Sequence, residues 1–402
     1  MLLAGALYLH GRVVGFAFAT QYDYHDITQS VRVMQSGQNP YQPLDVAPGG
    51  TSTFGPTHSN YPPTAYVLLA PLPAVAAGVG DVGWIVFNEL LVVAVVVVVY
   101  MGIGRPSLTE ALGVAALVAA FLPVWHNLWW GQVNLVVLLL VVLAMLAHQR
   151  GLAIPGGIAL GSAVAIKLAP VALIPYFLWK RNWRLAAATV VTLGIVVGVT
   201  LLVGWGPRWA QYYDFLGPSG RGTALVNNQT LNGMLLRLWR PDLNGYPIGS
   251  PPAGFVPVWY ALNILVVGLM LAVLRRIRSG DPLMIWAELA VVLVVLSLVQ
   301  PIAWFAHHVA AIVAIVVAVR LARQRALPAA AAAGLVVAYV LATPVAAVIG
   351  LTVGGSLGAD QGHQPVLQVA TSALVFGAVL AVVCLGAARL NAARAREARL
   401  LD

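Results

Sequence analysis

Charged residues are scarce in this chain of 402 residues, because Asp, Glu, Lys and Arg together make up 9% of it. A soluble domain usually carries about 25% charged residues. Hydrophobic residues account for 60% of the chain, and the mean hydropathy is +0.87. This composition excludes a soluble globular enzyme. Because apolar runs recur from one end to the other, we predict one membrane-embedded bundle with no room for a separate soluble domain.

Cysteine and lysine are almost absent as well. Cys384 is the single cysteine, which excludes an intrachain disulfide framework and any metal site built on cysteines. The chain has 2 lysines against 20 arginines, and most arginines form short clusters between apolar runs. Such clusters are typical of the cytoplasmic loops of membrane proteins and not of a nucleic-acid surface. We therefore expect the lipid bilayer as a partner and no nucleic acid.

Ten apolar runs are long enough, at about 20 residues each, to cross roughly 30 Å of hydrocarbon as helices. They lie near residues 1–21, 82–104, 109–125, 133–148, 185–204, 256–274, 283–300, 305–322, 329–350 and 367–388. The first run has neither a basic leader nor a clear cleavage site, which favours a membrane helix over a signal peptide. Two further runs, 61–80 and 153–179, contain several prolines.

The arginine clusters indicate which loops share a side of the membrane. If the clusters are all cytoplasmic, the long loops 22–60 and 205–255 are external. Arg150 and Lys180 are then both cytoplasmic, although too few residues separate them for two crossings. The prolines between them predict an interrupted helical hairpin. The sequence thus predicts an all-α polytopic membrane protein with about 10–12 transmembrane or membrane-embedded helices, and it leaves open whether the two proline-rich runs cross fully.

The first external loop carries two acidic residues close to the membrane. Ile27, Val31 and Met34 recur at helical spacing, which predicts a short interfacial helix with Asp23 and Asp26 on one face of its first turn. Two carboxylates in this position suit a general base and a group that positions its substrate. The alternative is that both simply cap the helix and interact with its dipole.

Three polar residues stand inside apolar runs. Gln132 and Asn134 open a run that is otherwise apolar, and either hydrogen bonds between helices or contacts to a substrate would explain them. Lys167 lies inside the interrupted hairpin, far from the basic clusters. A cation at membrane depth indicates function, for example binding of a lipid phosphate, unless the side chain extends to the membrane surface.

The second external loop combines arginines with amides. Arg208, Arg221 and Arg237 could bind phosphate oxygens, while Asn228 and Gln229 could bind sugar hydroxyls. External arginines are also often simply solvated.

A further polar element follows the run 283–300. Trp304 is followed by His307 and His308 near the external end of a predicted span. Neighbouring residues of a helix diverge by about 100°, and no third ligand is evident nearby, so a hydrogen-bonding or proton-handling role is favoured over metal binding. Structural histidines at the membrane interface remain the alternative.

Taken in chain order, these elements resemble the integral-membrane glycosyltransferases of family 87, which are polyprenyl-phosphate-mannose-dependent mannosyltransferases with the GT-C fold. The resemblance covers residues 23–308 and rests on several short motifs. The motifs are Asp23-Tyr24 with Gly37 and Tyr41 after it, Tyr61-Pro62-Pro63, Gly131-Gln132-Val133-Asn134, Lys167-Leu168-Ala169-Pro170, Asn228-Gln229-Thr230-Leu231-Asn232-Gly233, and Pro301-Ile302-Ala303-Trp304 followed by His307-His308. We accordingly predict a GT-C-type domain at residues 1–388 and a basic cytoplasmic tail at 389–402.

The resemblance implies roles for particular residues. A loop aspartate acts as the catalytic base in that family, and the spacing to Gly37 and Tyr41 assigns this role to Asp23, with Asp26 as the substitute. The two histidines would assist at the same site. Lys167 and the loop arginines would bind the donor phosphate, and the remaining polar and aromatic residues would contact substrate. The remaining residues are Tyr41, Tyr61, Gln132, Asn134, Asn228, Gln229 and Trp304.

The implied reaction is an inverting transfer of a hexose, most simply mannose, from a polyprenyl-phosphate donor to a glycolipid or glycan acceptor outside the cytoplasm. The lipid phosphate is itself a good leaving group, so we expect neither a metal ion nor another cofactor. The interrupted helix with its intramembrane lysine leaves a secondary transporter or lipid flippase as the alternative. The sequence does not distinguish mannose from arabinose or glucose, nor does it identify the acceptor.

Overall fold

The computed structural model describes residues 2–17, 21–41, 61–239, 251–275, 281–343 and 372–401. Several predicted features lie outside these residues. They are the part of the first external loop at 42–60, the part of the second at 240–250, and residues 344–371, which include the ends of the last two apolar runs.

The predicted fold class, an all-α polytopic membrane protein, is confirmed. Within the described residues the regular secondary structure is helical, apart from one isolated β-bridge between Asn228 and Trp304. In this part of the chain 5 helices are long and apolar enough to cross a membrane, or 6 if one bent pair counts as a span. The chain divides into two compact units, one with residues 13–98 and 127–218, the other with residues 1–12, 99–126 and 219–402. We call them the acidic unit, which contains Asp23, and the histidine unit, which contains His308.

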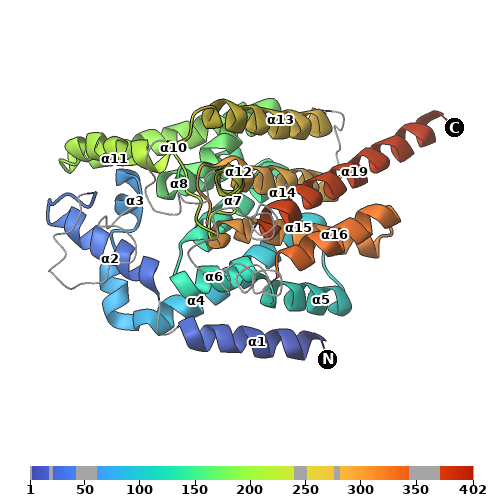
Figure 1. Cartoon of the computed structure of the whole chain (residues 1–402), viewed down its shortest axis with the longest axis horizontal. Coiled ribbons are helices and arrows are strands. Elements are labelled where there is room, and N and C mark those ends of the chain that lie inside the picture. The colour runs from blue at the N-terminus through green and yellow to red at the C-terminus, as the bar shows by residue number, and fades with distance from the viewer. Residues whose placement is uncertain are drawn as a thin grey trace. The chain divides into compact units, whose positions relative to one another are not determined.

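The acidic unit consists mainly of eight helical segments in the described residues, most of which are labelled in Figure 1. They are α2 (Tyr22–Gln35), α3 (Pro63–Leu68), α7 (Asn134–Gln149), α8 (Ala153–Ile166), η1 (Ala169–Ala172), α9 (Leu173–Trp179), α10 (Trp183–Leu202) and α11 (Gly206–Ser219). Most of the long helix α4 (Leu72–Ile103) and the end of α6 (Leu122–Trp130) also belong to this unit.

Helix α8 forms the centre of the acidic unit, because it packs against both α7 and α10. Gly157 and Gly161 permit this close approach. A Cβ at Gly157 would lie 2.3 Å from the Cβ of Ala188, and one at Gly161 would lie 2.6 Å from that of Thr192. Small residues commonly allow membrane helices to pack this closely.

The interruption predicted from the prolines is present after α8. The helix ends at Ile166, Lys167 has extended backbone angles (φ −145°, ψ 127°), and the short η1 follows with Pro170 in its first turn. A proline lacks the amide hydrogen that a continuous helix would need here. The break therefore places Lys167 at the C-terminal cap of α8, where its backbone amide still donates to the carbonyl of Ala163 (3.0 Å) while the chain turns away from the helix.

The short interfacial helix predicted for the first loop is also present as α2. Its apolar residues Ile27, Val31 and Met34 are all buried, as the spacing predicts, while Asp26 is exposed and Asp23 is partly buried. The helix thus binds to the unit through one face and leaves its acidic first turn near the surface.

The histidine unit contains α5, α12 to α16 and α19, with α1 and α6 extending into both units (Figure 1). Their bounds are α1 (Leu2–Ala17), α5 (Leu108–Ala119), α12 (Leu231–Trp239), α13 (Phe255–Arg275), α14 (Pro282–Val299), η2 (Phe305–Ala311), α15 (Ile312–Arg323), α16 (Ala329–Leu341) and α19 (Ala373–Leu401). The core of this unit is α14, which contacts α12, α13, α15, α19 and η2.

Four boundaries differ from the apolar runs of the sequence. Helix α4 begins within the run 61–80, with Pro73 in its first turn, where proline is tolerated. It kinks at Gly80, whose backbone angles are not helical. The run 109–125 bends by 57° between α5 and α6. The second long loop contains α11 and α12, and the last helix, α19, continues through the basic tail.

Candidate active site

Asp23 stands in the first turn of α2, which is anchored by the residue before it. Gln21 is fully buried, and its side-chain amide donates hydrogen bonds to the carbonyls of Ala17 (3.2 Å) and Leu128. Tyr24 is also buried, and its ring stacks on that of Trp84 with the centroids 4.8 Å apart. The residues on both sides of Asp23 are therefore fixed by the protein interior.

The turn before α7 holds both charged residues of the site. The side-chain amide of Gln132 donates a hydrogen bond to Asp23, and the side-chain oxygen of Asn134 accepts one from Lys167, Nζ to Oδ1 2.5 Å. Gln132 and Asn134 are both buried. The two amides, for which the sequence leaves open hydrogen bonds between helices or contacts to a substrate, thus bind the acidic and the basic group of the protein itself.

Gly131 allows this turn to form. Its φ of +69° belongs to the left-handed region that favours glycine. A Cβ at this position would also lie 2.7 Å from Gln21 Oε1 and from Tyr24 Cβ. The glycine of the motif is therefore required both for its backbone conformation and for the close approach of α2.

The environment of Asp23 favours its neutral form. Burial is the main cause, the nearby negative charge of Asp26 adds to it, and together they raise the pKa of Asp23 to about 7. The positive charge of Lys167 and the hydrogen bond from Gln132 act in the opposite direction. A carboxylate with a pKa near neutrality is suited to accept and release a proton.

Two aromatic residues of the predicted site lie beside these groups. Lys167 is partly buried, and its ammonium lies 5.9 Å from the centroid of the Tyr61 ring. The hydroxyl of Tyr41 donates to the carbonyl of Tyr61 (2.8 Å), so the described end of the first loop is tied to the start of α3. The acidic unit therefore brings together Asp23, Gln132, Asn134, Lys167 and Tyr61.

The arginines of the second loop are placed differently. Arg208 donates to Gln211 Oε1 (2.8 Å) and to the carbonyl of Gly37 just after α2. Arg237 is buried and donates to the carbonyls of Leu225 (2.9 Å) and Asn228 (2.8 Å). Both side chains bind the chain's own backbone, while Arg221 is exposed.

Asn228 is the centre of the polar cluster in the histidine unit. Its Nδ2 donates to the carbonyls of Thr223 (3.0 Å) and Pro301 (3.1 Å), and its Oδ1 accepts from the amide of Ala303 (3.1 Å). The backbone amide of Gln229 also donates to the carbonyl of Ala303 (2.9 Å). These hydrogen bonds join the motif around Asn228 to the motif around Trp304.

His307 and His308 come shortly after Trp304 in the chain, next to the hydrogen bonds of Asn228. The backbone amide of Trp304 donates to Nδ1 of His307 (2.7 Å), which places His307 in the first turn of η2. His308 is buried and hydrogen-bonds the backbone of Gln229. Within the described residues, its Nε2 has no hydrogen-bond partner.

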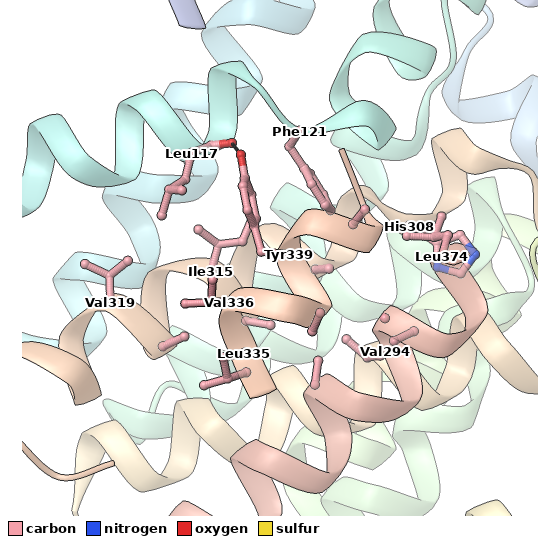
Figure 2. A pocket seen from close by; sticks show the side chains of 18 of the residues that line it. Leu117, Phe121, Val294, His308, Ile315, Val319, Leu335, Val336, Tyr339 and Leu374 are labelled. Atoms are coloured by element: carbon pink, nitrogen blue, oxygen red, sulfur yellow. Dashed lines mark hydrogen bonds between the residues drawn. The ribbon is translucent and has the colours of Figure 1, made fainter. Parts of the chain in front are cut away.

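An apolar cavity of about 320 Å³ adjoins His308 (Figure 2). Its walls come from α5, α14, η2, α15, α16 and α19 and are almost entirely aliphatic. Ser297 and Tyr339 also line it, but their hydroxyls donate to carbonyls of Leu293 (3.2 Å) and Leu117 (2.7 Å). The hydroxyls of the lining are thus bonded to the protein's own carbonyls, and Nε2 of His308 is itself buried. A pocket of this size, apolar with few polar groups, is typical of small-molecule sites.

Three residues of the acidic unit escaped the sequence analysis. Trp84, Asn88 and Asn127 are buried and hydrogen-bonded around the turn that contains Gly131. The sequence did contain an indication of the two asparagines, because an amide inside an apolar helix is costly to bury without a hydrogen-bond partner. Asn88 lies within the run 82–104, which was interpreted only by its hydrophobicity.

Comparison with known proteins identifies the family. The model of glycosyltransferase family 87 matches residues 60–301. A polyprenol-phosphate-mannose-dependent alpha-(1-2)-phosphatidylinositol mannoside mannosyltransferase of Mycobacterium tuberculosis is 27% identical over 268 residues, which are 62% of this chain and 58% of that protein. A protein of the same name from Mycolicibacterium smegmatis is 30% identical over 215 residues, 51% of this chain and 45% of the other.

The chain thus spans about half the length of the curated relatives that it matches. The family match includes Gln132, Asn134, Lys167 and Asn228, while Asp23 lies before it. Because the family model covers more than half of the chain, the protein belongs to glycosyltransferase family 87.

Proposed function

We propose that the protein transfers a mannosyl residue from a polyprenyl-phosphate carrier to a glycolipid or glycan acceptor. The family and the printed names of its two relatives support the donor and the sugar. The observation that carries the proposal is the turn at Gly131–Asn134, which holds the carboxylate of Asp23 and the ammonium of Lys167 through amides two residues apart.

Asp23 is the proposed general base. It removes the proton from an acceptor hydroxyl, and the oxygen then attacks the anomeric carbon of the donor sugar. The bond between that carbon and the phosphate oxygen breaks, and the electron pair leaves with the lipid phosphate. Attack from the side opposite the leaving group inverts the configuration. The raised pKa of Asp23, about 7, supports this role, since a base works best when its pKa is near the working pH.

Lys167 is the proposed binding group for the donor phosphate. Its position in the break after α8 and its hydrogen bond to Asn134 hold the ammonium in place without neutralising it. A fixed positive charge stabilises the negative charge that develops on the departing phosphate. Arg208 and Arg237 bind backbone carbonyls instead, which favours Lys167 over these two arginines.

A lipid-linked substrate is further supported by the cavity beside His308. Its aliphatic lining suits a hydrocarbon chain, and its wall includes Val336, which is 63% exposed on α16. The chain of a membrane lipid can reach such a site from the bilayer.

The proposed location is the cell membrane, with the reaction on its extracytoplasmic side. The arginine clusters support this orientation, because they follow the later spans in the alternating pattern expected of cytoplasmic loops. Donor hydrolysis to a free sugar or transport without transfer are the competing outcomes.

The test is transfer from a synthetic polyprenyl-phosphate mannose to a mixture of phosphatidylinositol mannosides, with the full-length protein in membranes. The variants are Asp23→Asn, Asp26→Asn and the matched control Asp214→Asn, which removes an exposed acid from α11. We expect loss of about 10²-fold or more in rate for Asp23→Asn alone. Absence of transfer in the wild type, or undiminished transfer in the Asp23→Asn variant, contradicts the proposal.

A further inference from the structure

Asn88 and Asn127 are two buried amides without an obvious substrate role. Asn88 is 1% exposed in the middle of α4, and Asn127 is fully buried in α6. Both helices are strongly apolar. Burying an amide costs free energy unless its hydrogen bonds are replaced, so such residues require a structural or functional reason.

The hydrogen bonds of the two residues form a chain that ends at the turn before α7. Nδ2 of Asn127 donates to Oδ1 of Asn88 (3.0 Å) and to the carbonyl of Gln132 (3.3 Å). Nδ2 of Asn88 donates to the carbonyl of Trp84 (3.0 Å), and Nε1 of Trp84 donates to the carbonyl of Gly131 (2.9 Å). The carbonyls of Gly131 and Gln132, which are consecutive, are therefore both held by side chains.

The backbone of Gly131 and Gln132 is restricted further by its own conformation and by a backbone hydrogen bond. The amide of Gln132 donates to the carbonyl of Asn127 (3.0 Å), and Gly131 adopts a left-handed conformation. The backbone N–H and the carbonyl of Gln132 are thus both hydrogen-bonded, so the Cα from which its side chain extends has a fixed position. That side chain reaches Asp23.

We propose that Asn88 and Asn127 are positioning residues for Asp23, because they fix the Gly131–Gln132 turn from which Gln132 donates its hydrogen bond to the carboxylate. The inference rests on the proposed function, since the role of Asp23 as base is itself proposed. Neither asparagine touches the carboxylate. They act through Gln132, and Trp84 assists by holding the neighbouring carbonyl.

The competing explanation is that the two amides merely join α4 to α6. A purely structural role predicts lower stability and less active protein, with unchanged properties in the molecules that fold. A positioning role predicts a changed base in the folded protein. The two explanations therefore differ in the pH dependence of the rate and not in the amount of protein.

The hydrogen bond from Gln132 favours the ionised form of Asp23, so its weakening raises the pKa of that carboxyl. The other groups that face Asp23 are Asp26 on α2, Lys167 after α8 and the hydroxyl of Tyr61. None of them is changed by a substitution at Asn127. A shift of the acid limb of the pH–rate profile in an Asn127 variant would therefore show that Asn127 acts on Asp23 through Gln132.

The experiment measures kcat and KM for polyprenyl-phosphate mannose between pH 5.5 and 8.5 with the purified full-length protein. We expect Asn127→Ala to move the acid limb of kcat upward by roughly half a unit to one unit. We also expect kcat to fall about tenfold with little change in KM, because the base is misplaced while the donor site stays intact. Asn88→Ala should act in the same direction.

Two further variants separate positioning from folding. Trp84→Phe keeps the ring on Tyr24 but removes the hydrogen bond to Gly131, so it should shift the limb in the same direction by less. Asn263→Ala is the matched control, because Asn263 on α13 also donates to a carbonyl of a neighbouring helix, that of Val299 (3.2 Å), but has no contact with this turn. Its profile should coincide with that of the wild type.

An acid limb that stays in place in the Asn127→Ala and Trp84→Phe variants overturns the inference, as does an equal shift in the Asn263→Ala variant. Asp23→Asn is measured alongside. If that variant still transfers mannose, the proposed function itself fails. If it is inactive while the limb of Asn127→Ala does not move, only the positioning role fails.

Discussion

Lys167 and Asn134 are joined by a hydrogen bond of 2.5 Å, although they come from the break after α8 and from the start of α7. Asn134 is buried and its side-chain oxygen faces the ammonium. The bond supplies one acceptor for the three hydrogens that an ammonium group can donate. The cation is thus oriented while part of its donor capacity is left for a ligand.

Replacement of Lys167 by methionine should reduce transfer by about 10²-fold, because the length of the side chain is kept and the positive charge beside the phosphate is lost. The matched control is Lys180→Met, which removes the other lysine of the chain, at the end of α9. Rates measured at saturating and limiting donor separate binding from chemistry. Equal effects of the two substitutions would contradict the assignment of Lys167.

The rate of transfer should depend on pH through Asp23. A general base must be ionised, and burial together with Asp26 raises the pKa of Asp23 to about 7. The rate should therefore rise as the pH increases towards about 7 and fall again at higher pH, where the buried Lys167 loses the proton that its role requires. Asp26→Asn removes a like charge, so it should move the rise to lower pH. A rate with no rise on the acid side of this range would argue against Asp23 as the base.

Gly131 and Gly151 offer a comparison between two glycines with positive φ, +69° and +74° respectively. Alanine at either position incurs the strain of the left-handed region, about 1–2 kcal/mol. At Gly151 a Cβ meets nothing within 4 Å, whereas at Gly131 it collides with Gln21 and Tyr24. Gly131→Ala should therefore be less stable than Gly151→Ala by a further 1–3 kcal/mol or so. The stabilities of the two variants are compared by thermal unfolding in detergent, and their transfer rates are measured alongside.

Local sequence patterns predicted several elements of this structure. The spacing of Ile27, Val31 and Met34 predicted α2 and its buried face, and the prolines predicted the break that contains Lys167. Both features depend on neighbouring residues only. Helical periodicity and the missing amide of proline are properties that a sequence displays directly.

The arrangement of the site was not predicted, because it depends on contacts between distant residues. For Gln132 and Asn134 the sequence left open hydrogen bonds between helices or contacts to a substrate, and it did not indicate that their partners are Asp23 and Lys167. For Arg237 it left open a phosphate or solvent, whereas the side chain is buried and bonded to backbone carbonyls. Which partner satisfies a buried polar group is decided by the tertiary fold, and residue type restricts only the kind of partner.

The cavity beside His308 predicts where a bulky side chain will interfere with a lipid substrate. Ala318 on α15 lines the cavity, so Ala318→Phe should fill part of it and raise the KM for a long-chain donor or acceptor about tenfold. Ala330→Phe is the control, since Ala330 is exposed on α16 outside the lining. Varying the two lipids separately identifies which chain uses the cavity. If neither KM changes, the cavity does not hold a substrate chain.

Among the ion pairs of the described residues, the one between Arg389 and Glu288 should be the most costly to break. Arg389 is fully buried on α19, Glu288 is 1% exposed on α14, and the guanidinium donates to the carboxylate. Removal of one partner leaves a buried charge without its counter-ion, so Glu288→Gln should lower the free energy of unfolding by about 3–5 kcal/mol. The exposed pair of His25 and Asp81 is the comparison, and Asp81→Asn should cost less than about 1 kcal/mol.

A double substitution distinguishes the cost of an isolated charge from the worth of the pair. With leucine at both Glu288 and Arg389, neither charge has to be desolvated, and well-packed apolar side chains often replace a buried ion pair without loss of stability. The double variant should therefore unfold at a higher temperature than Glu288→Gln. If the double variant is less stable than the single one, α19 depends on the pair for more than charge neutralisation, since removal of both charges would then cost more than removal of one.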